Sequence, residues 1–382
     1  MMSFGEPWPE FNEGIHYHDL LRPSDAGIPL AAASQIVYTY VCVNNISRVL
    51  IFRSNADRVL LYWLQRIHNK QITIDGCVVT DPNSILRGAE ELVYHRLPWN
   101  EPDAPYLLEI LYEDDDVIAL NKPSGLQVLP GGLFQQRTVL TQLQRHASNL
   151  TTSGYHEPHP VPVHRLGRGT SGILLCAKTK IAKSRLASFF ADGTSLVGVR
   201  RGNDTQPKVT RNITKVYRAL ASGVIIEDQV VIDQPIGLVK YPGVSKGLYV
   251  ASPLGKPALS KVVVLERNLP SNSTLVQVEI QSGRPHQIRI HLSSIGHPLI
   301  GDPLYDIGGQ PKCSDHESVD ESFAQDGGYE RPEKPVPGDC GYHLHAHRVV
   351  FSHPLTNEII EITAPLPPIL QTVVESKAKE SP

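Results

Sequence analysis

The first clear periodicity along the chain lies within its N-terminal hundred residues. After Asp57, apolar side chains recur at a spacing of three to four, which predicts an amphipathic helix formed by Val59, Leu60, Trp63, Leu64 and Ile67. The run ITID, a turn at Asp75–Gly76 and the run ELVYHRL then predict a strand, a tight turn and a second strand. The apolar run 36–43 predicts an earlier strand, and residues 1–35, which hold four prolines, predict an irregular extension. The sequence therefore indicates a small accessory domain over 36–98.

A second pattern begins after a proline-rich stretch. Residues 99–106 are predicted to form a linker, since PWNEPDAP holds three prolines in eight residues. The runs LEILYE and VIALNK predict two strands joined by an acidic turn at 114–116, and a helix is expected over 138–147. These elements place the start of a larger domain at 107, and we expect it to extend to 368.

The later part of this domain also has helical and strand periods. ILLCAK predicts a strand, an amphipathic helix is expected from Lys180, and ITKVYRALASG alternates as a strand does. In the block SGRPHQIRIHLSSIGHPLIGDPLY at 282–305, Ile288, Ile290 and Leu292 alternate with Arg289 and His291, which predicts a half-buried basic strand. The mixture of strand runs and separate helices indicates an α+β class.

Length and composition agree with a folded protein of two domains. The chain has 382 residues, 41% of them hydrophobic and 20% charged, and lacks any run near the roughly 20 uncharged apolar residues of a membrane-spanning helix. We therefore expect no membrane association. Four acidic residues precede the first basic one, Arg22, so we expect neither a signal nor a transit peptide and predict a cytoplasmic or nuclear protein. The five cysteines form no CxxC pair and are expected to be reduced thiols.

Charge is unevenly distributed although the whole chain carries only -3. Residues 161–218 contain twelve Lys or Arg against Asp192 and Asp204, a local net charge of +10. Positive charges attract a polyanion if they form one patch, and are ordinary solvated surface charges if they are scattered. The motifs in this stretch must separate the two interpretations.

Three blocks supply those motifs, in the order HRLGRGTSGILLCAK, KVYRALASG and GRPHQIRIHLSSIGHPLIGDPLY. The first lacks the P-loop pattern. Together they resemble the RluA-type RNA pseudouridine synthases, whose blocks read HRLDxxTSGxxxxAK, KxYxAxxxG and GRxHQIRxHLxxxGHPxxGDxxY. The chain is similar to plant-like eukaryotic members that carry HRLG. The likeness runs from about 107 to 364 and includes a KPSG turn and LHAHRVVFSHPLT. The helix, DG turn and strands before it resemble an alpha-L RNA-binding motif, although an ordinary helix–hairpin accessory domain fits those residues equally well.

The resemblance implies a fold and a reaction. It implies a pseudouridine synthase fold with a central mixed, mostly antiparallel sheet and flanking helices. It also implies isomerisation of a uridine flipped out of tRNA or rRNA, from a loop or single strand, without metal or organic cofactor. The family tyrosine that packs on the base corresponds to Tyr217, and the family arginine that keeps the catalytic aspartate ionised corresponds to Arg289. Contacts to RNA are expected from His164, Arg165, Arg168, Thr170, Arg200, Arg201, Arg284 and His286.

One position departs from the family pattern. Gly167 stands where the family has its aspartate, so the carboxylate that acts on the sugar is absent from its place. A buried arginine without its carboxylate costs free energy unless another group replaces the partner, and Asp302 and an RNA phosphate are the two candidates for Arg289. Base flipping and binding use other residues, so the alternative function is a catalytically silent RNA-binding protein of the same fold.

The remaining segments add alternatives of lower weight. His343, His345 and His347 alternate near Cys340 and suggest a metal-dependent scaffold, yet the stretch also matches the family's LHA strand, so we expect no metal. Residues 306–341 hold an acidic insertion with seven acids between 313 and 334, which is typical of a solvated loop. The tail 369–382 is predicted to be disordered, and the protein to be a monomer.

Overall fold

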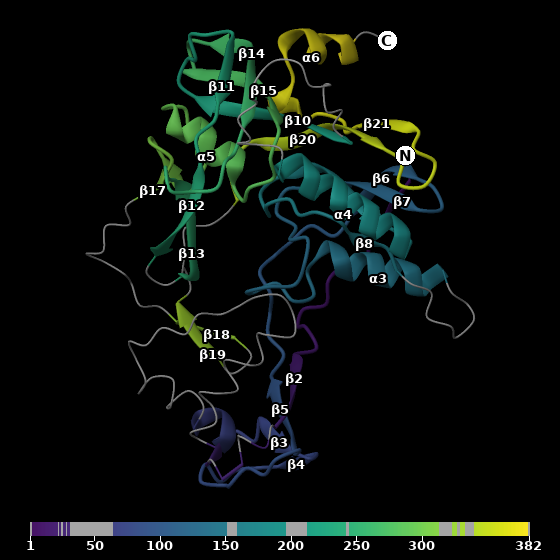
Figure 1. The fold of residues 1–382 in the computed structure, drawn as a ribbon, viewed down its shortest axis with the longest axis vertical. Coiled ribbons are helices and arrows are strands. Elements are labelled where there is room, and N and C mark those ends of the chain that lie inside the picture. Colours follow the sequence, from purple (N-terminus) through teal and green to yellow (C-terminus); the bar gives the residue numbers. More distant parts are fainter. Residues whose placement is uncertain are drawn as a thin grey trace.

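The fold consists of one large sheet with helices on both faces and a small sheet at one end (Figure 1). It is seen in a computed structural model that describes residues 2–21, 64–150, 159–195, 212–241, 244–312, 323–326, 329–332 and 340–380, with 23, 26–27 and 29–30 in addition. Within these residues an α+β architecture is confirmed.

The large sheet has eleven strands in the order β1-β6-β7-β9-β20-β10-β15-β14-β11, with β21 on β20 and β8 on β9. Among the pairings between described strands, only β9 with β20 is parallel, so the sheet is mixed and mostly antiparallel, as expected. The strands are β1 (Ser3–Phe4), β6 (Leu108–Glu113), β7 (Val117–Lys122), β8 (Val161–Pro162), β9 (Ser171–Ala177), β10 (Ile213–Ser222), β11 (Gln229–Ile232), β14 (Ser260–Asn268), β15 (Ser273–Ile280), β20 (Leu344–Ser352) and β21 (Ile359–Thr363).

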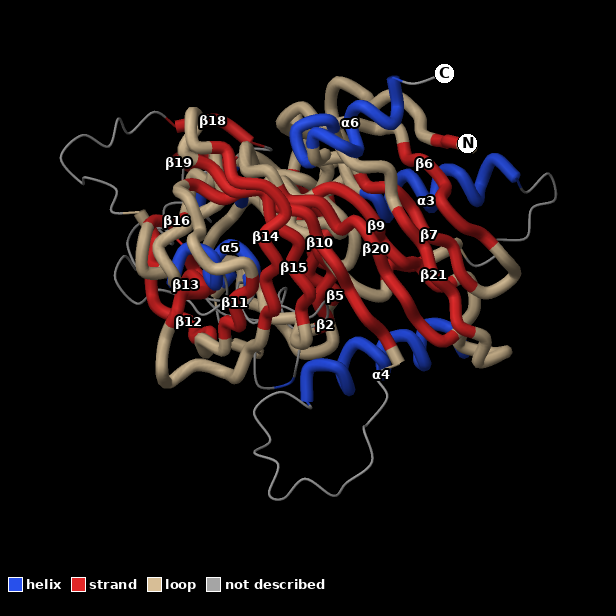
Figure 2. The backbone as a smooth tube through the Cα atoms, turned by 90° about the horizontal axis from the view of Figure 1, so that it is seen from above, coloured by secondary structure: helices blue, strands red, loops and turns tan. Residues whose placement is uncertain are grey.

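Strand β9 shows why the sheet is covered on both sides. Its alternate residues Ile173 and Leu175 pack with Leu186 of helix α4 (Lys180–Ser195). Leu174 and Cys176 pack instead into a second cluster that contains residues of α3 (Val139–Leu150) and α5 (Gln287–Ser294). In Figure 2 strands β7, β9 and β20 of the large sheet lie between α3 and α4. A strand buried on both faces is continuously apolar, as the ILLCA run is.

The block around 288–292 is a helix and not the predicted strand. Residues Gln287–Ser294 form α5, in which all of positions 287–293 are buried. The alternation of apolar and polar residues over 288–292 does not mark one buried and one exposed face. Its polar members, Arg289 and His291, are buried and have hydrogen-bond partners. The hairpin β12 (Ile236–Tyr241) and β13 (Val244–Ala251) lies beside this helix, as do the short strands β16 (Tyr305–Asp306) and β17 (Gln310–Pro311).

The N-terminal residues form a four-stranded sheet in the order β2-β5-β3-β4. Its strands are β2 (Ile15–Leu20), β3 (Ile72–Ile74), β4 (Cys77–Val78) and β5 (Glu91–Arg96). Asp75 (φ 48°) and Gly76 (φ 78°) both occupy the left-handed region, so the DG turn forms as predicted. It closes a hairpin of β3 with the short β4, and the predicted strand ELVYHRL pairs with β3 as β5. Residues 1–35 are less irregular than expected, since β1 joins the large sheet and β2 the small one. The helix is described from 64 to 68, and the rest of it and the 36–43 strand lie outside the described residues.

Three connecting segments also differ from simple loops. In the predicted linker, Trp99 and Glu101 are buried, and the Glu101 carboxylate accepts backbone N–H groups of residues 135–137 at 2.8–2.9 Å. Within 306–341 the structure describes a hairpin of β18 (Phe323–Asp326) and β19 (Tyr329–Pro332). The tail is a 3-10 turn (Pro368–Leu370) followed by α6 (Val373–Glu380), and its predicted disorder is wrong.

The physical reason for the ordered tail is a capping box. Glu375 accepts the Thr372 N–H at 2.8 Å, and the Thr372 hydroxyl accepts the Glu375 N–H at 3.2 Å. Arg218 of β10 then pairs with the Glu375 carboxylate at 2.7 Å. No helix in the described part of the chain is long and apolar enough to cross a bilayer.

Candidate functional site

The loop that carries Gly167 is held from below by the KPSG turn. The buried Lys122 ammonium donates to the carbonyl oxygens of Pro123, Leu126 and Arg168 at 2.8, 2.7 and 3.1 Å. The Ser124 hydroxyl donates to the Gly169 carbonyl oxygen at 2.8 Å. A buried ammonium needs several acceptors to offset its lost hydration, so these bonds fix the loop against the end of β7.

Helix α5 delivers a second buried cation, Arg289, whose partner is Asp302 of the GDPLY turn. Arg289 Nε and Nη2 each donate to one oxygen of the Asp302 carboxylate at 2.7 Å. The same carboxylate accepts the N–H groups of Leu304 and Tyr305 at 2.9 and 3.2 Å. Of the two candidate partners for Arg289, Asp302 is therefore confirmed.

Burial and pairing act in opposite directions on this ion pair. Burial by itself would raise the pKa of the Asp302 carboxyl, but hydrogen bonds and charge from Arg289, together with the two backbone N–H groups, hold that pKa below its usual value. The guanidinium carbon of Arg289 lies 4.3 Å from the ring centroid of Tyr342 and 5.0 Å from that of Tyr305. Two aromatic faces therefore flank a cation that is already neutralised by a carboxylate.

Gly167 lies next to Tyr342, and a side chain at position 167 would require the Tyr342 hydroxyl to shift. A Cβ atom built on Gly167 would lie 2.8 Å from the Tyr342 hydroxyl oxygen, closer than such contacts occur in proteins. That hydroxyl also shares a hydrogen bond of 3.2 Å with the Thr170 hydroxyl. The Gly167 φ is outside the left-handed region, so the close approach, and not backbone strain, explains the glycine.

Tyr217 reaches the same side of the sheet because β10 is irregular at that point. The register against β20 shifts between Val216 and Tyr217. Before the shift, Lys215 lies over the Phe190 ring of α4 at 5.3 Å. After it, Tyr217 packs in the cluster that contains Leu166 and Tyr342. Burial raises the pKa of the Tyr217 phenol, which stays protonated at neutral pH.

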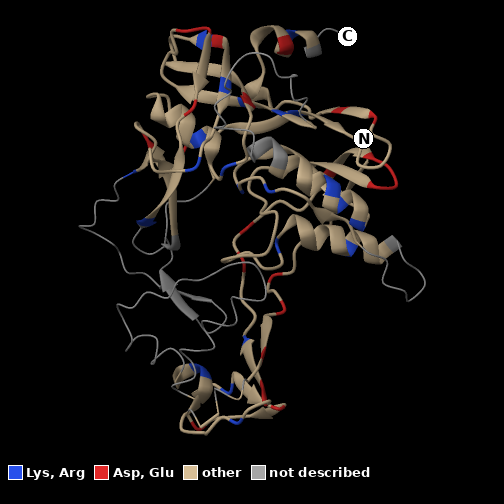
Figure 3. Ribbon diagram, in the orientation of Figure 1, with Lys and Arg blue, Asp and Glu red and all other residues tan. Residues whose placement is uncertain are grey.

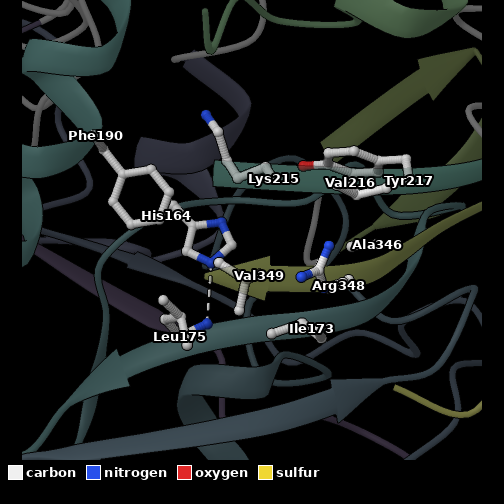
Figure 4. Close-up of a pocket in the computed structure, with 10 residues that line it drawn as sticks. All are labelled: His164, Ile173, Leu175, Phe190, Lys215, Val216, Tyr217, Ala346, Arg348 and Val349. Carbon is white, nitrogen blue, oxygen red and sulfur yellow. Dashed lines mark hydrogen bonds between the residues drawn. The ribbon is translucent and has the colours of Figure 1, made fainter. Parts of the chain in front are cut away.

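His164 is turned toward α4 and the sheet. It stacks on Phe190 at 4.6 Å between ring centroids, and its Nε2 accepts the Leu175 N–H at 2.9 Å, as drawn in Figure 4. Burial, followed by the charge of Lys215, lowers its pKa to about 3, so this imidazole is neutral. The pocket that these residues line also includes Tyr217 and Arg348. His164 therefore packs against α4 and β9, and takes no part in the contact between Gly167 and Tyr342.

The other residues predicted to contact RNA are dispersed. Arg165 is exposed, and Arg168 lies over the Phe134 ring at 4.9 Å. Arg284 donates to the Pro257 carbonyl oxygen at 3.0 Å, and His286, at φ 55°, precedes α5 and bonds through Nδ1 to the Tyr305 hydroxyl at 2.8 Å. Arg200 and Arg201 lie outside the described residues.

Several cations of the basic stretch 161–218 already have protein partners. Lys178 pairs with Glu113 at 3.0 Å, and Arg218 with Glu375. Figure 3 shows the described basic residues spread over α4 and neighbouring elements. The structure thus groups Gly167, Thr170 and Arg289 around Tyr342, and Tyr217 belongs to the same hydrophobic cluster as Tyr342. It does not gather the predicted arginines into one described patch.

The histidine cluster has ordinary hydrogen-bond partners. His345 Nδ1 bonds to the Ser171 hydroxyl at 2.8 Å, and His347 Nδ1 to the Ala364 carbonyl oxygen at 2.9 Å. Among the described residues, no group of three or more His, Cys, Asp or Glu is arranged to hold a metal ion. The geometry therefore lends no support to the metal-dependent scaffold.

Two residues of this site were not among the site residues predicted from the sequence. Tyr342 belongs to the site through a contact with residues more than 170 positions earlier, which no local pattern reveals. Lys122 was included in the KPSG turn, but its burial and its carbonyl acceptors depend on the Gly167 loop. A lysine at the end of an apolar strand, directly before a turn, was the available signal.

Comparisons with known proteins define the class. Residues 116–294 match the family model for RNA pseudouridylate synthase. The chain is 61% identical over 378 residues to "RNA pseudouridine synthase 5" of Arabidopsis thaliana, covering 97% of this chain and 98% of that protein. It is 59% identical to the protein of the same name in Oryza sativa subsp. japonica, over 99% of this chain and 93% of the relative. The chain therefore belongs to the RNA pseudouridine synthase family.

A solved structure also matches at low identity. Human RNA Pseudouridylate Synthase Domain Containing 1 is 22% identical, covers 72% of this chain and 95% of its own, and gives a TM-score of 0.46. The family assignment comes from the sequence relatives.

Proposed function

We propose that this protein isomerises uridine to pseudouridine in RNA, through a flipped uridine bound beside Tyr217 and the Gly167 loop. The observation that carries the proposal is the family membership over nearly the whole chain, since 98% of the Arabidopsis relative is covered at 61% identity. The pairing of the buried Arg289 supports it, because the cation that belongs to the reaction centre by resemblance is retained and paired with the Asp302 carboxylate.

In this proposal Tyr217 supplies an aromatic face for the flipped uracil. A tyrosine ring in an apolar cluster offers stacking of about 1–3 kcal/mol per base without demanding a particular sequence. Arg165, exposed on the loop, supplies a phosphate contact. The RNA is expected to be a tRNA or rRNA with the target uridine in a loop or single strand.

A second candidate is a catalytically silent RNA-binding protein, favoured by Gly167 alone. Glycine has neither a nucleophile nor a base, and the Asp302 carboxylate is committed to Arg289 and two backbone N–H groups. Binding and base flipping use other residues, so they survive the loss of chemistry under this candidate.

Tritium release from RNA labelled at uridine C5 tests the proposal, because forming the C5 glycosidic bond expels that hydrogen. Total RNA from cells lacking this protein serves as substrate. We expect release by the unmodified protein, a loss with Tyr217→Leu, and unchanged RNA affinity with the matched Tyr217→Phe variant, which keeps the ring. RNA binding without release by the unmodified protein would instead establish the silent binding protein.

A further inference from the structure

Position 167 lacks a carboxylate, but a hydroxyl group of another residue lies beside it. An ideal Cβ at Gly167 would lie 2.8 Å from the Tyr342 hydroxyl oxygen, so that oxygen occupies the space beside the loop backbone where a carboxylate at 167 would begin. Gly167 itself is exposed, whereas Tyr342 is buried and its hydroxyl is hydrogen-bonded to Thr170. The absence of a side chain at 167 is therefore what allows an oxygen nucleophile from another element to approach this loop.

The surroundings of that hydroxyl suit a reacting group. Its Thr170 partner, at 3.2 Å, orients the oxygen toward the 167–170 turn. The Arg289 guanidinium carbon lies 4.3 Å from the Tyr342 ring centroid, and its positive charge, although shared with the Asp302 carboxylate, favours negative charge developing on the phenol oxygen. Arg289 Nη1 is buried and makes no hydrogen bond within the described part of the chain, so one N–H pair of this cation is not used by Asp302.

We propose that the Tyr342 hydroxyl takes the catalytic place of the missing carboxylate and attacks C1′ of the target uridine. The inference rests on the proposed function, which supplies the substrate. Tyrosine is an established alternative to a carboxylate as the nucleophile at a sugar carbon in other enzymes.

The step balances without a further reactant. The phenol oxygen bonds to C1′ while the C1′–N1 bond breaks, its electron pair passes to the uracil, and the phenol proton is taken up at N1. After the uracil turns, C5 attacks C1′ and the C1′–O bond breaks with its electron pair returning to the tyrosine oxygen. That phenolate then removes the C5 proton, which regenerates the phenol and yields pseudouridine.

Two variants separate this role from a structural one. Tyr342→Phe removes only the oxygen and keeps the ring on Arg289. We expect it to lower the kcat of tritium release by about 100-fold or more, the effect typical of losing a nucleophile or proton-transfer group, with RNA affinity and melting temperature close to those of the parent. Gly167→Ala, with Tyr342 retained, places a methyl group against the hydroxyl and is expected to lower kcat as well.

A restored carboxylate provides the control for an intact cleft. In Gly167→Asp/Tyr342→Phe the hydroxyl that would collide with the aspartate Cβ is gone, so the double variant should release tritium even though Tyr342→Phe does not. Loss of release in Tyr342→Phe together with recovery in the double variant supports the inference.

Three outcomes overturn it. Release by Tyr342→Phe at the parent rate removes the tyrosine from the chemistry and leaves the proposed function standing. A silent parent with an active double variant shows a competent cleft in which Tyr342 does no chemistry. Silence from parent and double variant alike, on RNA that both bind, refutes the proposed function and the inference with it.

Discussion

The buried pair of Arg289 and Asp302 gives the sharpest prediction for stability. Asp302→Ala removes the carboxylate that accepts two hydrogen bonds of 2.7 Å from a guanidinium only 2% exposed. Removing one partner of a buried pair leaves an uncompensated charge, which costs about 3–5 kcal/mol of unfolding free energy. Domains are stable by only about 5–15 kcal/mol, so this variant should unfold at much lower urea concentration.

A double-mutant cycle distinguishes the pair from other effects of the substitution. Arg289→Met and Asp302→Asn each break the ion pair, whereas the double variant removes both charges and keeps side chains of similar volume. We expect the double variant to lose at least about 2 kcal/mol less than the sum of the single losses, because neither charge is left alone. Urea unfolding followed by circular dichroism measures all four free energies. Additive losses, or a loss below about 1 kcal/mol in Asp302→Ala, would refute the reasoning.

The same pair predicts that the unfolding free energy declines at acidic pH. The folded-state pKa of Asp302 is lowered, so the carboxylate contributes stability above its unfolded pKa of about 4, and that contribution is lost as pH falls through the lower folded value. The unfolding free energy of the parent should therefore decline below about pH 4, and the decline should be shallower in Asp302→Asn. An equal decline in both proteins would mean that other carboxylates cause it.

Two further predictions concern the loop and the tail. Lys122→Met removes a buried ammonium and leaves the Arg168 carbonyl oxygen without that donor. We expect the unfolding free energy from urea unfolding to fall by about 1–3 kcal/mol and the kcat for tritium release to fall as well. Full activity at reduced stability would show that Lys122 does not position Gly167. Thr372→Ala removes the capping box with Glu375 and should cost about 1 kcal/mol, read as faster amide exchange confined to α6, which an unchanged exchange pattern would contradict.

Much of the fold could be predicted because the responsible interactions are local. The Asp75–Gly76 hairpin, the strands around the acidic turn at 114–116, and the helices of 139–150 and 180–195 each follow from turn chemistry or from a hydrophobic period within a few residues. The tail helix was also encoded locally, by Thr372 and Glu375, and the polar composition of the segment masked it.

Local periodicity was misleading where burial was complete. Alternation predicts a strand only if polar residues face water, and in α5 both Arg289 and His291 are buried with partners outside the helix. The helix therefore shows no exposed polar face from which its period of 3.6 could be read.

The sequence by itself determined the family, through three motif blocks in order, and it established that the aspartate position holds Gly167. The tertiary structure decided what surrounds that position. It paired Arg289 with Asp302 and brought Tyr342 to Gly167, a contact that follows from strand order and helix packing. Motifs record which residues are present within one segment, whereas distances between segments far apart in the chain are set only when the sheet and its helices close around a common core.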